Sequence, residues 1–288
     1  MRMKQIQRVC VIGAGVMGRQ IALNAAAGGF AVVLTDSFPD ALKKAGAWSR
    51  SYLEGSVQKG KLTQEEMEGT LARVTLEDSL EAALSGADLV IEAIIEEEAV
   101  KRELFTTVSR AAPPDAIVTS NSSYIPSSTF AGLFQEPGRL ANLHYFNPAM
   151  RMKLVEIVRG PHTSGETIEA LKQFVTAVGK TYIIVEKEIE GFVVNRLLRA
   201  VQDEGYYLLE HGVASFADID KGAELGLNYP MGPFRLMDLT GLDINYYNRR
   251  HRYEQTGREE DRPPRQLEER FQRGEYGKKT GKGWYSYD

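Results

Sequence analysis

Three glycines near the start of the chain could bind a phosphate group. Gly13, Gly15 and Gly18 follow the short apolar run Val9–Ile12. In a strand–turn–helix unit, the first glycine allows the tight turn, the second lets the backbone approach a pyrophosphate, and the third lets the helix pack against the strand. The spacing alone is a weak signal, but apolar runs on both sides and a helical period between them supply the context of a dinucleotide-binding unit. The alternative is a glycine-rich turn without a ligand.

An acid follows the next apolar run and indicates which dinucleotide would bind. Asp36 comes directly after Phe30–Thr35, where a carboxylate can bind both hydroxyls of an adenine ribose. It would repel a 2′-phosphate, and Ser37-Phe38-Pro39 offers no Arg or Lys to bind one. The pattern therefore predicts NAD rather than NADP. The residues expected to contact it are Gly13, Ala14, Gly15, Val16, Met17, Gly18 and Asp36.

Four histidines could act as a general acid or base, because the ordinary pKa of histidine is near neutral. His162 lies in a turn sequence, His211 at a predicted helix end, and His251 in a basic, solvated stretch. His144 instead follows the apolar run Leu140–Leu143, and sites in parallel sheets form at the carboxyl ends of strands. We therefore take His144 as the candidate base. The alternative is a core histidine with satisfied hydrogen bonds.

A lone acid, Glu156, lies in the middle of the apolar run Leu154–Val158. If buried, its carboxylate needs a partner. A carboxylate behind a catalytic histidine fixes the tautomer of the imidazole and stabilises the imidazolium. The alternative is an acid on the exposed face of a strand.

The elements that must position these residues follow an α/β pattern. Helical periodicity predicts helices within 39–69 and 100–110. Further apolar runs predict strands at Ala87–Ile94, Asp115–Ser120, Leu140–Phe146, Leu154–Val158 and Thr181–Val185. Alternating strands and helices indicate a Rossmann-type doubly wound parallel sheet, with the option of an antiparallel edge.

After Glu190 the pattern changes to long helical periodicity without strands. We place the domain boundary between 187 and 188, so that an NAD-binding domain (1–187) precedes an all-helical domain (188–288). A domain of about 100 residues has a small core. We therefore expect the helical domain to pair with a second copy in a homodimer. Its first apolar stripe consists of Val194, Leu197, Leu198, Val201, Leu208 and Leu209.

Composition narrows the possible partners and location. The 288 residues are 43% hydrophobic and 26% charged, with a net charge of −4, which gives no reason to expect nucleic acid or a membrane surface as partner. No apolar run approaches the ~20 residues that span a bilayer. The single cysteine, Cys10, cannot form an internal disulfide, and the run around it breaks at Gly13, too soon for a signal-peptide core. We expect a reducing, cytoplasmic location and no metal ion.

Five further segments resemble the L-3-hydroxyacyl-CoA dehydrogenases, including the bacterial 3-hydroxybutyryl-CoA dehydrogenases. They span nearly the whole chain in the order of that family. The segments are SNSSYIPSS (120–128), NLHYFNPAMRMKLVEIV (142–158), EGFVVNRLL (190–198), YPMGPFRLMDLTGLD (229–243) and YGKKTGKGWYSY (276–287). The resemblance implies NAD-dependent oxidation of (S)-3-hydroxyacyl-CoA to 3-ketoacyl-CoA and the reverse reduction, on short chains such as 3-hydroxybutyryl-CoA, within fatty acid β-oxidation. It also implies a Rossmann domain followed by a helical dimerisation domain.

The resemblance assigns roles to individual residues. Glu156 would pair with His144, while Ser123 and Asn195 would complete the catalytic set and contact the substrate. Ser123 is one of several serines in its loop, and Asn195 could instead be a helix-cap or surface amide. The residues implied near the cofactor are Glu96, Lys101 and Asn147.

Two departures from the family pattern concern the substrate. Tyr124 stands where a second small serine is common. In the helix after the second strand, Tyr52 and Lys59 fall at the positions of the family's CoA-binding serine and lysine, with Ser51 adjacent. Lys59 is therefore the candidate CoA-binding residue.

Two other functions fit parts of the same sequence. A dehydrogenase of a free hydroxy acid, resembling the L-gulonate and carnitine dehydrogenases, is suggested by EKEIEGFVVNRL and SSYIPSS. A non-catalytic NAD-binding protein, like the related lens crystallin, is the second alternative. A complete set of Ser123, His144, Glu156 and Asn195 argues against the latter.

Overall fold

The computed structural model describes residues 5–287. The chain divides into two compact units, Met1–Val193 (unit 1) and Val194–Asp288 (unit 2). The division follows the last strand and falls a few residues after the boundary expected at 187/188. The first four residues and Asp288, which the expected domains included, lie outside the described part.

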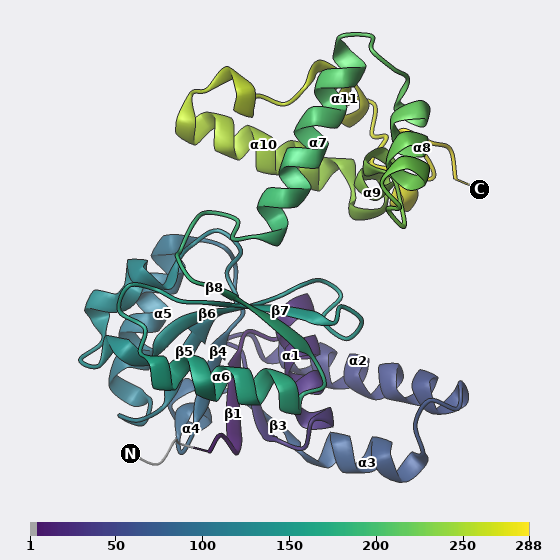
Figure 1. The fold of residues 1–288 in the computed structure, drawn as a ribbon. Coiled ribbons are helices and arrows are strands. Elements are labelled where there is room, and N and C mark those ends of the chain that lie inside the picture. The colour runs from purple at the N-terminus through teal and green to yellow at the C-terminus, as the bar shows by residue number, and fades with distance from the viewer. Residues whose placement is uncertain (1–4, 288) are drawn as a thin grey trace. The chain divides into compact units, whose positions relative to one another are not determined.

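Unit 1 is built around a single sheet (Figure 1). Among the described residues the sheet has eight strands in the order β3-β2-β1-β4-β5-β6-β7-β8. Neighbouring strands are parallel except β6 and β7, which are antiparallel. This confirms the predicted doubly wound fold. The strands are β1 (Arg8–Ile12), β2 (Ala31–Thr35), β3 (Val74–Glu77), β4 (Leu89–Glu92), β5 (Ile117–Ser120), β6 (Leu140–Tyr145), β7 (Leu154–Val158) and β8 (Thr181–Val185).

Helices cover both faces of this sheet, because alternate residues of each strand point to opposite sides. Val9 and Val11 of β1 pack with residues of α1, α2 and α6, whereas Cys10 and Ile12 pack with residues of α4, α5 and the 3₁₀ helix η1. The helical elements of unit 1 are α1 (Val16–Ala27), α2 (Pro39–Gln58), α3 (Gln64–Ala72), α4 (Leu80–Leu84), α5 (Glu98–Ala111), η1 (Ser127–Leu133), η2 (Pro137–Arg139) and α6 (Gly165–Ala177).

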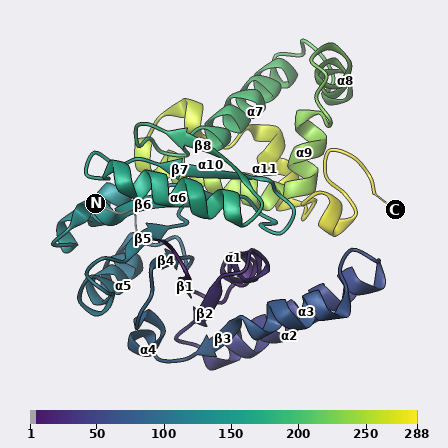
Figure 2. The ribbon, with the colours of Figure 1, turned by 60° about the horizontal axis from the view of Figure 1, so that its bottom comes forward.

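The helical stretch expected over 39–69 is two helices. A break after α2 is followed by Thr63, whose side chain accepts from the Glu66 N–H while the Glu66 carboxylate accepts from the Thr63 N–H. This capping box starts α3. Figures 1 and 2 show α2 and α3 lying side by side.

Unit 2 contains helices and short 3₁₀ turns, with isolated bridges near its end. Its core packs Tyr206, Phe234, Met237 and Trp284 together with Leu242 and Leu267. No helix in residues 5–287 has the length and apolarity needed to cross a membrane. The elements are α7 (Val194–Glu210), α8 (Phe216–Gly226), α9 (Pro233–Thr240), α10 (Leu242–Thr256), η3 (Glu259–Asp261), α11 (Arg265–Gln272) and η4 (Lys278–Thr280).

Two buried aspartates accept hydrogen bonds from the backbone of the last two blocks of the family resemblance. Asp220 accepts hydrogen bonds from the N–H groups of Phe234 and Arg235, at the start of α9. Asp238 accepts from the N–H groups of Trp284 and Tyr285. These bonds satisfy buried carboxylates and tie the end of the chain to α8 and α9.

Candidate active site

His144 and Glu156 form a buried pair across the antiparallel strands β6 and β7. They are directly opposite in register, and His144 Nδ1 lies 2.7 Å from Glu156 Oε2. Glu156 is fully buried, and His144 is 3% exposed. Glu156 Oε1 also accepts the Val193 N–H at 3.0 Å. The acid therefore does not lie on the exposed face of its strand.

This pairing determines which nitrogen of His144 is available for chemistry. A carboxylate only accepts hydrogen bonds, so the proton of a neutral His144 lies on Nδ1 and leaves Nε2 as an acceptor. The Ser123 hydroxyl lies 3.0 Å from Nε2 and can donate to it. The rings of Phe146 and Phe192 pack edge-on to the imidazole. Ser123, His144 and Glu156 thus form one hydrogen-bonded relay.

Glu96 holds the loop that carries Ser123. Its Oε1 accepts the Ser122 hydroxyl and the N–H groups of Ser123 and Tyr124, the latter two at 3.0 Å. Burial would raise the pKa of Glu96, but the charge of Lys101 and these hydrogen bonds outweigh it and hold the pKa below its ordinary value. The serine loop is therefore anchored to a charged carboxylate.

Lys101 connects Glu96 to a second acid. Its ammonium lies 2.5 Å from Glu92 Oε1 and 3.3 Å from Glu96 Oε2. Lys101 is 1% exposed and Glu92 is fully buried. The Ser120 hydroxyl donates to the other oxygen of Glu92 at 2.6 Å.

A cavity of about 610 Å³ opens next to this network. It contains most of the residues predicted to bind the cofactor; Ala14, Gly18 and Asn147 are not part of its lining. The lining consists of Gly13, Gly15, Val16, Met17, Asp36, Ser37, Phe38, Ala93, Ile94, Ile95, Glu96, Val100, Lys101, Asn121, Ser122, Ser123 and Tyr124.

The three glycines of the opening motif differ in what excludes a side chain. A Cβ on Gly13 would lie 2.6 Å from the Ala93 carbonyl oxygen, and one on Gly18 would lie 1.7 Å from the Gly13 oxygen. A Cβ on Gly15 would meet nothing within 4 Å. The fold itself requires Gly13 and Gly18, whereas Gly15 leaves open space beside the start of α1. This fits a pyrophosphate that approaches the backbone there.

Asp36 is positioned by the same turn. Its Oδ2 accepts the Ala14 N–H at 2.7 Å and its Oδ1 accepts the Phe38 N–H at 2.9 Å. Both oxygens keep lone pairs free, because a carboxylate can accept about four hydrogen bonds. The side chain lines the cavity, where ribose hydroxyls can donate to it.

The remaining predicted residues lie elsewhere, and their roles stay predictions. Asn147 is exposed directly after β6, in a loop whose Ala149 and Met152 carbonyls accept from Lys180 Nζ at 2.7 Å. Lys59 is exposed and follows the last residue of α2. Asn195 lies in the first turn of α7, in unit 2.

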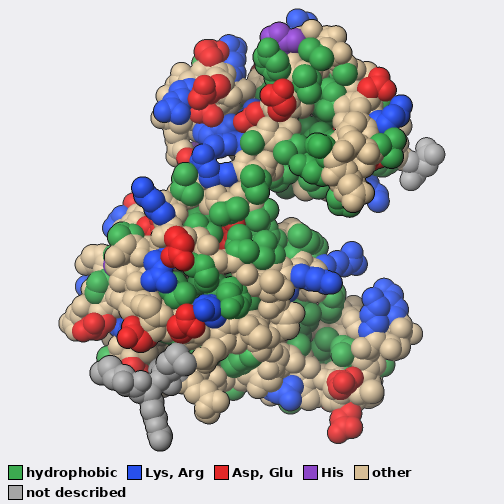
Figure 3. All heavy atoms as spheres, in the orientation of Figure 1, with side chains coloured by type: hydrophobic (Ala, Val, Ile, Leu, Met, Phe, Trp, Pro, Cys, Tyr) green, Lys and Arg blue, Asp and Glu red, His purple; other side chains and the backbone are tan. Residues whose placement is uncertain are grey.

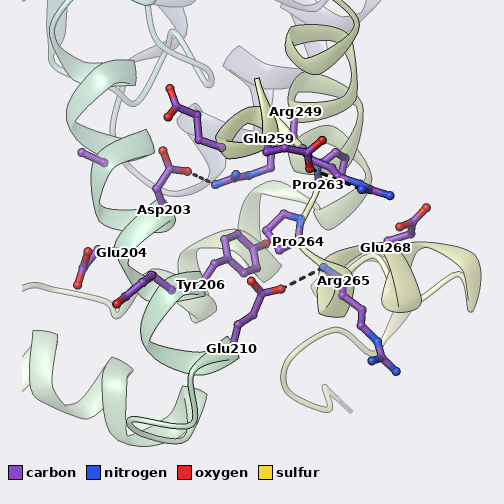
Figure 4. A pocket seen from close by; sticks show the side chains of 14 residues that line it. Asp203, Glu204, Tyr206, Glu210, Arg249, Glu259, Pro263, Pro264, Arg265 and Glu268 are labelled. Carbon is purple, nitrogen blue, oxygen red and sulfur yellow. Dashed lines mark hydrogen bonds and ion pairs between the residues drawn. The ribbon is translucent and has the colours of Figure 1, made fainter. Parts of the chain in front are cut away.

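A second cavity, of about 740 Å³, lies within unit 2 and contains none of the predicted site residues. Figure 4 shows Asp203 on α7 bonded to Arg249, with Tyr206 beside them. The Glu210 carboxylate in the same view accepts the Arg265 N–H at 3.1 Å. Most of the charged groups here have partners in the protein, so the cavity does not indicate a ligand.

Sequence reasoning missed two residues of the site. Glu92 was included in an apolar strand and Ser122 was not distinguished from its neighbours. The signal for Glu92 was the same as for Glu156, an acid within an apolar run, which requires a buried partner. Ser122 gave no comparable signal, because several serines crowd its loop.

Comparison with known proteins agrees with this architecture. Residues 8–189 match the model of the 3-hydroxyacyl-CoA dehydrogenase NAD binding domain, and residues 191–287 match that of the 3-hydroxyacyl-CoA dehydrogenase C-terminal domain. The chain is 37% identical to a probable 3-hydroxybutyryl-CoA dehydrogenase of Bacillus subtilis, over 99% of this chain and 98% of that protein.

A human protein and a bacterial crystal structure match the chain at similar identity. The chain is 38% identical to the human mitochondrial hydroxyacyl-coenzyme A dehydrogenase, over 98% of this chain and 91% of that protein. The crystal structure of (S)-3-hydroxybutyryl-CoA dehydrogenase PaaH1 from Ralstonia eutropha superposes with a TM-score of 0.89 at 35% identity, covering 99% of this chain and all of that one. The cofactor is NAD, as the match of unit 1 indicates. The chain belongs to the 3-hydroxyacyl-CoA dehydrogenase family.

Proposed function

We propose that this enzyme oxidises short (S)-3-hydroxyacyl-CoA substrates, such as 3-hydroxybutyryl-CoA, to 3-ketoacyl-CoA with NAD, and catalyses the reverse reduction in fatty acid β-oxidation. The observation that carries the proposal is the Ser123–His144–Glu156 relay, which begins at the wall of the cofactor cavity. It combines a base, a group that orients the base and a hydroxyl that reaches the cavity.

In the oxidation, the relay takes the proton of the substrate alcohol. His144 Nε2 accepts that proton, and the Glu156 carboxylate stabilises the resulting imidazolium through Nδ1. The Ser123 hydroxyl has one proton, so when substrate binds it donates to the substrate oxygen in place of Nε2, which leaves Nε2 to accept the proton of the alcohol. When bound, NAD supplies the acceptor for the hydride that leaves the same carbon. In the reduction, His144 returns the proton to the carbonyl oxygen.

Burial of the relay serves this chemistry. Phe146 and Phe192 exclude water from the imidazole, so the field of Glu156 acts on it with little screening. We also propose that Asn195 binds the substrate, on the strength of the family resemblance alone. Glu96, Lys101 and Asn147 are proposed to bind the cofactor on the same basis, and the first two line the cavity.

The α2–α3 hairpin supports a CoA substrate. Lys59 and Lys61 are exposed at the turn between the helices. Lys61, Tyr52 and Arg73 line a further cavity of about 620 Å³. Figure 3 shows both basic and acidic side chains on the lobe that contains α2 and α3. The exposed Lys59 and Lys61 at the turn are cations that can bind the phosphates of a CoA nucleotide.

One assay distinguishes this proposal from the alternatives. NADH oxidation is followed with acetoacetyl-CoA and, in parallel, with free keto acids such as acetoacetate. Turnover of the thioester at much higher kcat/KM supports the proposal. Equal turnover of the free acids would replace it with a hydroxy-acid dehydrogenase. Binding of NADH without turnover of any of these compounds would leave a non-catalytic NAD-binding protein.

We further propose that the enzyme is a homodimer built through unit 2. Its core is small, and Figure 3 shows apolar side chains gathered on its surface. Exposed apolar residues of this unit include Leu197, Tyr207, Val213, Leu225, Leu227, Leu239 and Ile244. Apolar side chains that gather on an exposed face, as in Figure 3, are typical of an interface. A single molar mass of one chain in light scattering at micromolar concentration would contradict the proposal.

The single cysteine is consistent with a reducing compartment, and we propose a cytoplasmic location. Cys10 is fully buried in β1, and burial raises the pKa of its thiol to about 12. The thiol is therefore protonated and unreactive, and a disulfide to it would require the strand to open.

A further inference from the structure

The proposed reaction leaves one buried carboxylate unused. Glu92 ends β4, behind the wall of the cofactor cavity, and is fully buried. Its Oε1 accepts from Lys101 Nζ at 2.5 Å and from the Ile94 N–H at 2.8 Å, and its Oε2 accepts from the Ser120 hydroxyl at 2.6 Å. Three donors converge on the group, one of them an ammonium, so the site is built for a charged carboxylate.

The charges around Glu92 do not balance. Lys101 lies between Glu92 and Glu96, at 2.5 Å and 3.3 Å. One ammonium offsets only one of two carboxylates, so the cluster has a net charge of −1. Glu92 and Lys101 are 0% and 1% exposed, so water and salt screen their charges weakly, whereas Glu96 is 37% exposed and is screened more.

The cluster lies at the end of the cavity where the hydride must be transferred. Lys101, Glu96 and Ser123 line the same cavity, and Glu96 accepts the Ser123 N–H at 3.0 Å. The Ser123 hydroxyl contacts His144, which is the base. The reacting carbon has to reach both the base and the nicotinamide, so the nicotinamide must occupy the Ser123 end of the cavity.

We propose that Glu92 is a positioning residue that holds Lys101 in place and leaves the cluster with one negative charge, and that this charge makes the site prefer the oxidised cofactor. The nicotinamide ring is positively charged in NAD⁺ and neutral in NADH. A unit charge about 12 Å away, with an effective dielectric constant of about 20, shifts a binding constant by about tenfold, and a closer charge shifts it more. Because bound NAD⁺ is stabilised relative to bound NADH, Glu92 thereby favours reduction of the ketone over oxidation of the alcohol on the enzyme. The proposal concerns NAD binding and does not depend on which substrate is oxidised.

Glu92→Gln tests this inference, because it removes the charge and preserves the shape. NAD⁺ and NADH are titrated separately into the purified dehydrogenase without substrate, by calorimetry, with wild type and variant in parallel. We expect the ratio Kd(NAD⁺)/Kd(NADH) to rise by about tenfold in the variant. If Glu92 only supports the structure, both cofactors weaken by the same factor and the ratio does not change, which would overturn the proposal.

Two controls separate charge from other effects. Glu103→Gln removes an exposed acid from the same helix as Lys101 and should leave the ratio unchanged. Ser120→Ala removes a hydrogen bond to Glu92 but keeps its charge, so it should lower the melting temperature and not the ratio. A tenfold shift of the ratio in either control would contradict the proposal.

A second variant keeps the test decisive if Glu92→Gln does not fold. Glu96→Gln removes the charge of the other carboxylate, whose side chain is 37% exposed, while the amide oxygen can still accept from the N–H groups of the Ser123 loop. It should shift the ratio in the same direction as Glu92→Gln. A ratio that stays constant or falls in Glu96→Gln would overturn the inference.

Discussion

His144 and Glu156 face each other because β7 runs against β6, with His144 Nδ1 and Glu156 Oε2 2.7 Å apart. Directly opposed residues of antiparallel strands have adjacent side chains on one face of the sheet. Here the chain reverses between Tyr145 and Leu154, so a base and its partner come from one short segment. A parallel β7 would require a long crossover between them. The change of strand direction in an otherwise parallel sheet thus brings together the two residues that we propose as the catalytic pair.

Substitution of the base should affect the chemical step and spare the cofactor. His144→Gln should lower kcat by ~10²–10⁴, the usual effect of a positioned general base. NADH affinity should be nearly unchanged, because His144 is outside the lining of the cofactor cavity. Steady-state kinetics with acetoacetyl-CoA and a separate NADH titration measure the two quantities.

Substitution of Glu156, the partner of His144, provides a stricter test of the same prediction. Glu156→Gln should slow turnover through a misoriented imidazole, and the double variant should lose far less than the product of the two single losses. Multiplicative losses would mean that the two residues do not act as a unit.

Asp36 should determine the choice between NAD and NADP. Asp36→Asn retains an oxygen acceptor for the Ala14 N–H but removes the charge that repels a 2′-phosphate. We expect kcat/KM for NADPH to rise relative to NADH, with a small fall in melting temperature because the amide nitrogen cannot accept the Phe38 N–H. Asp36→Ala should erode the preference further and also destabilise the turn. Comparable kcat/KM for NADH and NADPH in the unmodified enzyme would contradict the assignment.

The glycines of the opening motif should separate into two kinds when replaced by alanine. Gly18→Ala would place Cβ 1.7 Å from the Gly13 oxygen, so it should lower the melting temperature markedly. Gly15→Ala meets nothing in the protein and should fold normally, yet bind NADH much more weakly because its methyl group occupies the space that the pyrophosphate needs. Calorimetric melting and NADH titration distinguish the two. Unchanged NADH affinity in Gly15→Ala would show that the pyrophosphate binds elsewhere.

The sequence predicted the elements that have strong apolar periodicity and missed those that do not. The order of domains and the strands β1, β2 and β4 to β8 follow from short runs that are apolar or mostly apolar. β3 was not predicted, because Val74–Glu77 is a short edge strand of mixed polarity. The direction of β7 was also open, since strand polarity depends on how a loop crosses the sheet and not on local composition.

Residues of the site were predictable where a single position had a distinctive context. His144 and Glu156 stood out as polar groups at the end of one apolar run and within another. The choice of Ser123 among neighbouring serines came only from family resemblance. Glu92 shows the limit of prediction from sequence. Its context resembles that of Glu156, but its partner Lys101 lies nine residues later on a different element. Only the fold brings the two side chains together.

A second histidine should give the fold a pH dependence. Burial lowers the pKa of His162 below its ordinary 6.5, although the nearby Glu188 carboxylate and a backbone contact to Leu140 oppose this. The unfolded chain therefore takes up the proton at a higher pH than the folded chain, and stability falls as the pH drops below about 6.5. His162→Gln should flatten the change in melting temperature between pH 7.5 and 5.5. Parallel curves for wild type and variant would show that His162 makes no contribution.

The last prediction concerns Lys59 and its contact with the phosphates of CoA. Lys59 is exposed after the end of α2, and an exposed cation that binds CoA phosphates holds them equally in the ground state and the transition state. Lys59→Ala should therefore raise KM for acetoacetyl-CoA with little change in kcat. Lys44→Ala, which removes an exposed lysine from α2, should leave KM unchanged.

Salt and substrate truncation test whether the effect of Lys59 is a phosphate contact. The difference in KM between wild type and Lys59→Ala should shrink at high salt, because ions screen an exposed contact. A truncated thioester without the nucleotide should be turned over equally by both enzymes. If the truncated thioester is as sensitive as acetoacetyl-CoA, Lys59 acts on the acyl end or on the fold. If Lys59→Ala leaves KM for acetoacetyl-CoA unchanged, the nucleotide is bound elsewhere, and Lys61 and Arg73 beside the neighbouring cavity become the next candidates.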